Sequence, residues 1–112
     1  MVGPMVLKMP LYVFDGINLD LYQSEDTLSD CLEEQDVEKD VYQCFDSEGY
    51  SIMLNVAKGS TDFVVKTVKG SLNIRGLIES LHRSLSAVGV SLNEELTLSD
   101  LQNLAKSTFD IY

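Results

Sequence analysis

The sequence predicts an α+β domain, in which an antiparallel sheet of about five strands packs against helices in the order β-β-α-β-β-β-α-α. Two observations support this fold class. Short β-branched and aromatic runs follow one another through connections that suit antiparallel neighbours. Long apolar stripes with helical spacing occur only near the end of the chain, at residues 74–88 and 98–105.

The first two strands are predicted to form a hairpin. Residues 11–15 are rich in β-branched and aromatic side chains, and residues 17–22 alternate strictly between apolar and polar positions. Asp15 and Gly16 lie between the two runs, and an Asp-Gly pair in this position is a strong hairpin signal.

Three further strands are expected after residue 40, at residues 41–45, 50–57 and 62–68. Residues 46–49 separate the first two as a four-residue turn that ends on glycine, as type I turns prefer. The apolar run at residues 52–54 suggests that the second of these strands is buried on both faces.

Two helices are expected to follow the strands. The stripe from Ile74 to Val88 predicts the first, which Gly89 ends. Thr97 and Asp100 have the spacing of a capping box at the start of the second. The apolar residues after position 108 predict a tail that packs down onto the domain.

The negative charge is concentrated in residues 15–50. This segment holds twelve acidic residues and one basic residue, Lys39, which gives a net charge of −11. The remainder has seven basic and six acidic residues, and the whole chain carries −10. The segment therefore differs from an evenly distributed solubility coat.

A helix over residues 24–35 is expected within the acidic segment, with Ser24 as its N-cap. Leu28, Cys31, Leu32 and Gln35 form its apolar stripe, and no basic side chain lies at helical spacing from its carboxylates. Two interpretations have about equal weight, a solvated acidic face and a surface that binds a cationic partner. The candidate partner-binding residues are Asp26, Asp30, Glu33, Glu34, Asp36, Glu38, Asp40, Asp46 and Glu48.

Composition and motifs argue against several classes of function. A pI near 4.2 argues against binding to nucleic acid or to an anionic membrane. The sequence has no phosphate loop, dinucleotide fingerprint, zinc spacing or nucleophile motif. Its single histidine, His82, is expected to be a surface or interfacial residue and not a catalytic one. We therefore expect neither an enzyme nor a site for a metal or cofactor.

The chain is expected to be one domain, residues 1–112, with residues 1–9 as a flexible or extended segment. Its start does not read as a signal peptide, and a cytoplasmic location is expected. Cys31 and Cys44 are accordingly expected to be reduced and buried, the first in the helix stripe and the second in a strand.

Three stretches carry a resemblance to a known group of proteins. They read Asp20-Leu-Tyr-Gln-Ser-Glu-Asp-Thr-Leu28, Asp36-Val-Glu38 and Tyr42-Gln-Cys-Phe-Asp-Ser-Glu-Gly49. This pattern resembles small immunity proteins of polymorphic toxin and contact-dependent growth inhibition systems in bacteria. The resemblance implies a cytoplasmic antitoxin that binds a basic toxin domain, with a ribonuclease as the favoured target and a monomer in a 1:1 complex.

A small acidic secretion chaperone that binds an effector protein is the alternative. It is expected to be a homodimer with an exposed apolar groove, whereas the immunity protein is expected to be a free monomer.

Overall fold

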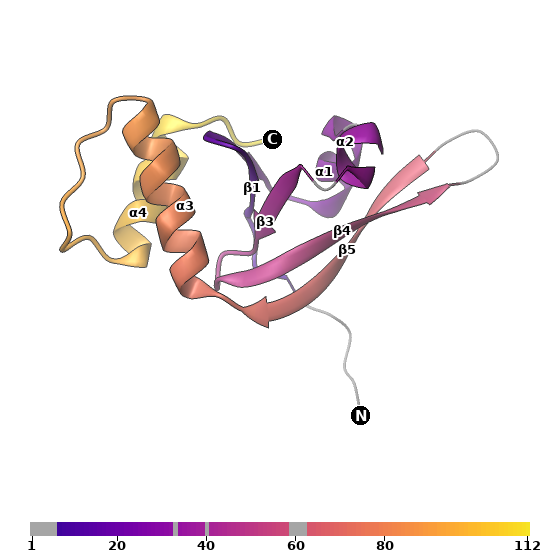
Figure 1. The fold of residues 1–112 in the computed structure, drawn as a ribbon, viewed down its shortest axis with the longest axis horizontal. Coiled ribbons are helices and arrows are strands. Elements are labelled where there is room, and N and C mark those ends of the chain that lie inside the picture. The colour runs from indigo at the N-terminus through magenta and orange to yellow at the C-terminus, as the bar shows by residue number, and fades with distance from the viewer. Residues whose placement is uncertain (1–6, 33, 40, 59–62) are drawn as a thin grey trace.

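The α+β class and its element order are confirmed. The computed structural model describes residues 7–32, 34–39, 41–58 and 63–112, and in it five antiparallel strands form one sheet in the order β2-β1-β3-β4-β5 (Figure 1). The strands are β1 Leu11–Asp15, β2 Asn18–Tyr22, β3 Tyr42–Phe45, β4 Tyr50–Lys58 and β5 Phe63–Leu72. The helices are α1 Glu25–Cys31, α2 Glu34–Glu38, α3 Ile74–Ala87 and α4 Leu98–Thr108.

The strand β1 lies inside the sheet and is buried on both faces. Residues 11–14 are at most 2% exposed, and β2 and β3 flank the strand on its two edges. The predicted hairpin is present, with Gly16 at a φ of 61°, a backbone conformation that suits glycine. Because side chains alternate along a strand, β1 contributes to two separate cores.

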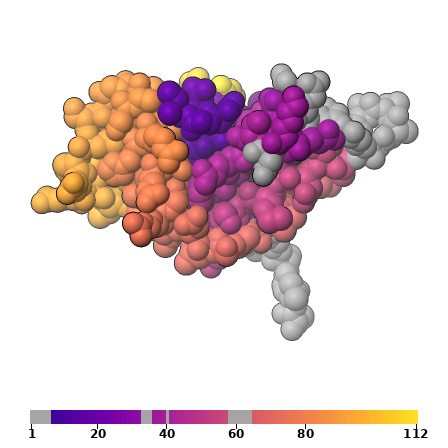
Figure 2. All heavy atoms as spheres, viewed as in Figure 1, coloured from indigo at the N-terminus to yellow at the C-terminus, as the bar shows by residue number. Residues whose placement is uncertain are grey.

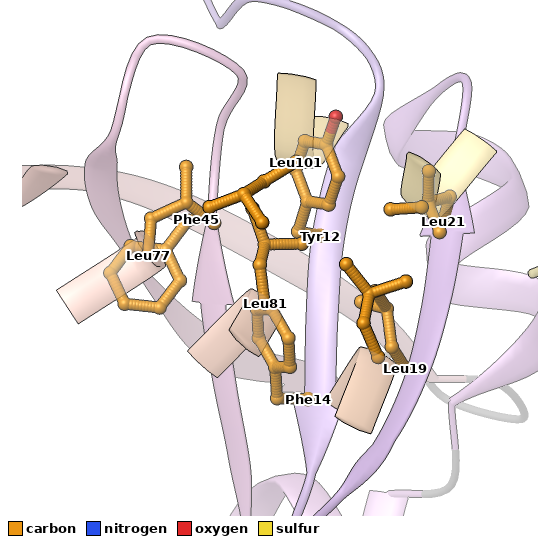
Figure 3. Close-up of a cluster of buried hydrophobic side chains, with 10 residues drawn as sticks. Tyr12, Phe14, Leu19, Leu21, Phe45, Leu77, Leu81 and Leu101 are labelled. Atoms are coloured by element: carbon orange, nitrogen blue, oxygen red, sulfur yellow. The ribbon is translucent and has the colours of Figure 1, made fainter. Parts of the chain in front are cut away.

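The helices α3 and α4 cover one face of the sheet, as expected. Leu77, Leu81 and Leu101 pack there against side chains from the first three strands of the sheet order (Figure 3). Asn73 caps α3, and Thr97 with Asp100 forms the predicted capping box of α4. The ends of the α3 stripe, Ile74 and Val88, are exposed.

The helices α1 and α2 cover the opposite face. Leu28, Leu32 and Val37 pack there among residues of β1, β3, β4 and β5, including Cys44. Figure 1 shows the two helix pairs on separate sides of the sheet, with β1 and β3 between them. The acidic segment therefore supplies one of the two apolar covers of the sheet.

The single helix expected over residues 24–35 is wrong at its C-terminal end. Ser24 caps α1 as predicted, but Leu32 is extended, with φ −84° and ψ 142°, and a separate helix α2 follows. Leu32 and Val37 are both buried. In a continuous helix they would point about 140° apart, because five residues at 3.6 per turn exceed one full turn. The break allows both to face the sheet.

The hairpin of β4 and β5 extends beyond the rest of the sheet as an arm (Figure 1). The strand β3 pairs only with Ser51 and Ile52 of β4. Beyond that point Leu54 and Val56 pack toward α1 and α2, whereas Met53 is 57% exposed on the opposite face beside Val68. The expectation that residues 52–54 are buried on both faces is therefore wrong.

Other segments contact both edge strands of the sheet. The C-terminal tail runs parallel to β2, where Leu21 donates to the Asp110 carbonyl at 3.4 Å and accepts from the Tyr112 amide at 2.8 Å. At the other edge, the Val65 amide of β5 donates to the Ser29 hydroxyl of α1 at 2.9 Å. The tail packs down as predicted.

The segment before β1 is held by the turn after β3. Leu7 is half-buried against the α1–α2 core, and the Ser47 amide donates to the Lys8 carbonyl at 3.0 Å. The first six residues of the segment expected to be flexible or extended lie outside the described residues.

Replacement of Leu81 by alanine should lower the free energy of unfolding by roughly 2–5 kcal/mol, because the side chain is fully buried between α3 and the sheet. Val88→Ala is the matched control on an exposed residue at the end of α3, and should change it by less than about 0.5 kcal/mol. Denaturant melts measure both. Equal effects of the two replacements would contradict the assignment of α3 to a core.

Candidate functional site

Two of the candidate acidic residues, Asp26 and Asp30, are exposed on α1. The helix presents them outward because its other sides are engaged. Leu28 is buried, Ser29 accepts a hydrogen bond from β5, and the Glu25 carboxylate accepts one from the Thr67 hydroxyl. Among the described residues, neither Asp26 nor Asp30 takes part in an ion pair.

The acidic surface continues onto α2, which lies next to the start of β3. Glu38 is exposed, and Asp36 is half-buried. The Tyr42 hydroxyl donates to the Asp36 carboxylate at 3.3 Å, which ties α2 to the start of β3. The surface formed by Asp26, Asp30, Asp36 and Glu38 is called the acidic face below.

Asp46 does not belong to this surface, which corrects the expectation from sequence. Its side chain is 0% exposed, and its Oδ1 accepts hydrogen bonds from the amides of Glu48 and Tyr50, each at 3.0 Å. This is the turn-forming use of an aspartate, whose carboxylate accepts hydrogen bonds from the backbone amides of its own turn. Gly49 completes the turn at a φ of 95°.

Of the remaining candidates, only Glu48 lies wholly within the described residues, and it is not part of the acidic face. Glu48 is exposed, but its turn lies at the opposite end of β3 from Tyr42 and α2. Glu33 and Asp40 lie outside the described residues, as does the side chain of Glu34.

A groove of about 620 Å³ lies beside the β1–β2 hairpin, next to the C-terminal end of α1. In Figure 2 the atoms of the hairpin, in indigo, lie between those of α3 and those of α1 and α2. The groove is lined by Asp15, Ile17, Asn18, Leu19, Asp20, Tyr22, Cys31, Leu32, Tyr42, Ala87, Val88 and Phe109.

The hairpin places its acidic side chains on the face that also carries α1 and α2. Asp20 lies opposite Val13, and Asp15 lies opposite both Asn18 of β2 and Tyr42 of β3. Val13 belongs to the α1–α2 core. The face covered by α1 and α2 is therefore apolar at Val13, and it becomes acidic and aromatic at the hairpin end of the sheet, at Asp15, Asp20 and Tyr42.

The electrostatics of the groove centre on Asp20. Partial loss of hydration raises the pKa of its carboxyl above the ordinary value of 3.8, and the negative charges of Asp110 and Asp15 raise it further. Burial, and then the charge of Asp20, raises the pKa of the Tyr22 phenol. Tyr22 also stacks on Tyr112, with ring centroids 5.5 Å apart. The groove thus holds negative charge next to neutral phenols.

Sequence reasoning missed Asp15, Asp20, Tyr22 and Tyr42 as site residues. A signal was present, because strict alternation in residues 17–22 places Asp20 and Tyr22 together on the face opposite Leu19 and Leu21.

The cysteines are both free, but they differ in exposure. Cys44 is buried in β3 as predicted, whereas Cys31 is exposed at the groove. The expectation of a buried Cys31 is wrong because the helix ends at this residue and only Leu32 turns inward.

In the described part of the chain, no group of three or more His, Cys, Asp or Glu side chains is arranged to hold a metal ion. None of its helices is both long enough and apolar enough to cross a membrane. Comparisons with protein-family models, with characterised proteins and with solved structures find no match to this chain. The resemblance to immunity proteins therefore stays a prediction.

Iodoacetamide should modify Cys31 in the native protein and Cys44 only after unfolding, because only the first thiol is exposed. Intact mass and peptide mapping without reductant should show one modification in native protein and two in denaturant. An unmodified pair in denaturant would reveal a disulfide and contradict both assignments.

Asp20→Asn should stabilise the protein at neutral pH, by less than about 1 kcal/mol because water screens an exposed charge. The raised pKa means that ionisation of Asp20 costs the folded state more than the unfolded state. The gain should therefore disappear below pH 3.8, grow as pH rises through the raised pKa, and stay constant above it. Denaturant melts across this pH range measure the difference in the free energy of unfolding between the variant and the parent. A variant less stable than the parent at neutral pH would refute the prediction.

Proposed function

We propose that this protein is an immunity protein, a cytoplasmic antitoxin that binds and neutralises a basic toxin domain delivered by a neighbouring cell. A ribonuclease is the favoured target. The antitoxin acts as a monomer in a 1:1 complex, and its acidic face contacts the toxin.

The observation that carries this proposal is that the two sides of α1 have different roles. Its apolar and hydrogen-bonding side chains attach it to the sheet, and Asp26 and Asp30 remain exposed at i, i+4 spacing. Like charges at this spacing destabilise a helix by about 0.2–0.5 kcal/mol per pair. A cationic partner would relieve that repulsion, whereas solvation alone leaves it in place.

The chemistry of a nuclease supports the same partner. A site that attracts phosphate groups is lined by basic side chains, so a folded acidic surface can occupy it or bind a basic face beside it. With a net charge of −10, the protein would also attract such a partner over a distance. Charges at the rim of an interface mainly set the association rate and its dependence on salt.

The proposal predicts that a gene beside that of this protein encodes a basic toxin domain, and the test uses that domain as the partner. Reversal of two exposed charges, in the double variant Asp26→Lys with Asp30→Lys, should lower the association rate constant roughly tenfold or more at low salt. Surface plasmon resonance at several salt concentrations measures the rate, and growth of cells that produce the toxin measures protection.

The matched control is Glu94→Lys with Glu95→Lys, two exposed residues in the connection between α3 and α4. It changes the net charge equally, but away from α1, and should have the smaller effect. If the two double variants lower the association rate equally, the change in net charge alone explains the effect. The acidic face would then be excluded as the interface. Light scattering measures the oligomeric state and so distinguishes the two candidate functions. An obligate dimer favours the secretion chaperone, and a monomer favours the immunity protein.

A further inference from the structure

We propose that the groove beside the β1–β2 hairpin receives an extended cationic segment of the partner protein, with an arginine or lysine side chain next to Asp15 and Asp20. This inference rests on the proposed function and names a second contact region, adjacent to the acidic face.

The first reason is unneutralised charge. The carboxylates of Asp15 and Asp110 act on Asp20 with the same sign. Among the described residues, neither Asp15 nor Asp20 forms an ion pair. A cation from a partner would supply the missing attraction, in a concave site with less water around it than an open surface.

The second reason is the apolar surface that lines the same groove. Ile17 is 52% exposed at the hairpin turn, and Val88 is 54% exposed at the end of α3, and both line the groove. Arginine and lysine carry aliphatic stems that bury against such surface while their charged ends reach polar groups. The combination therefore fits a long cationic side chain better than a small inorganic cation.

The third reason is the exposed edge of β2. The amide and carbonyl of Leu21 point away from β1, because both are bonded to the C-terminal tail. Outward-pointing residues alternate along an antiparallel strand, so the amide and carbonyl of Leu19 point the same way, into the groove. An extended segment can hydrogen-bond to this edge and hold its side chains beside Asp20.

The test uses a blocked alanine–arginine–alanine–arginine–alanine peptide and the isotope-labelled protein. Amide chemical shifts should change at Leu19, Asp20, Cys31 and Val88 as the peptide is added. The same peptide with citrulline for arginine keeps the shape without the charge, and should bind more weakly. Asp20→Asn should weaken binding of the arginine peptide about threefold, as expected for a partly exposed ion pair.

Glu94→Gln is the matched control, since it removes an exposed carboxylate between α3 and α4, outside both the groove and the acidic face. It should leave the affinity unchanged, and amide spectra confirm that both variants are folded. Shift changes centred on α1, equal binding of both peptides, or equal effects of both variants would overturn the groove assignment. Because no toxin is present, such a result leaves the toxin experiment to decide the proposed function separately.

Discussion

The burial of β1 on both faces is the constraint on which the other elements depend. A strand with four consecutive buried residues, 11–14, needs neighbours on both edges and an apolar layer on each side. The helices α3 and α4 form one layer, and α1 and α2 form the other. The acidic segment is therefore part of the folding unit, and its charge is carried by a structural cover of the sheet.

Magnitudes explain why this cover tolerates so much like charge. Full burial of a leucine or valine side chain stabilises by about 1.5–3 kcal/mol, and Leu28, Leu32 and Val37 are all buried beneath α1 and α2. A repulsive pair on a helix surface costs about 0.2–0.5 kcal/mol. Burial dominates, so the segment folds while its carboxylates remain at the surface. The repulsion is therefore a small term in the stability of the fold.

Local signals predicted much of the fold, and contacts distant in sequence decided the rest. The Asp15-Gly16 hairpin and the caps at Ser24 and Thr97 depend on adjacent residues and are visible in the sequence. The break at Leu32 depends on where Val37 meets the sheet, which no local pattern shows. For the site, the sequence predicts Asp26 and Asp30 on an acidic helix face, and both are exposed. It also predicts Asp46 as a partner-binding residue, but the Asp46 carboxylate accepts hydrogen bonds from the amides of its own turn. The groove at Asp20 lies where α1 ends at Cys31, a boundary set by the same break.

The hydrogen bond between Ser29 and Val65 has a consequence for solubility. An open strand edge is a template on which further chains add, and this is a common route to aggregation. The tail occupies part of the β2 edge, and α1 holds an outward amide of β5 with a single side-chain oxygen. Local release of α1 would uncover this β5 amide together with the apolar side chains beneath the helix. The helix that carries the exposed carboxylates thus also covers part of a strand edge on which a further chain could add.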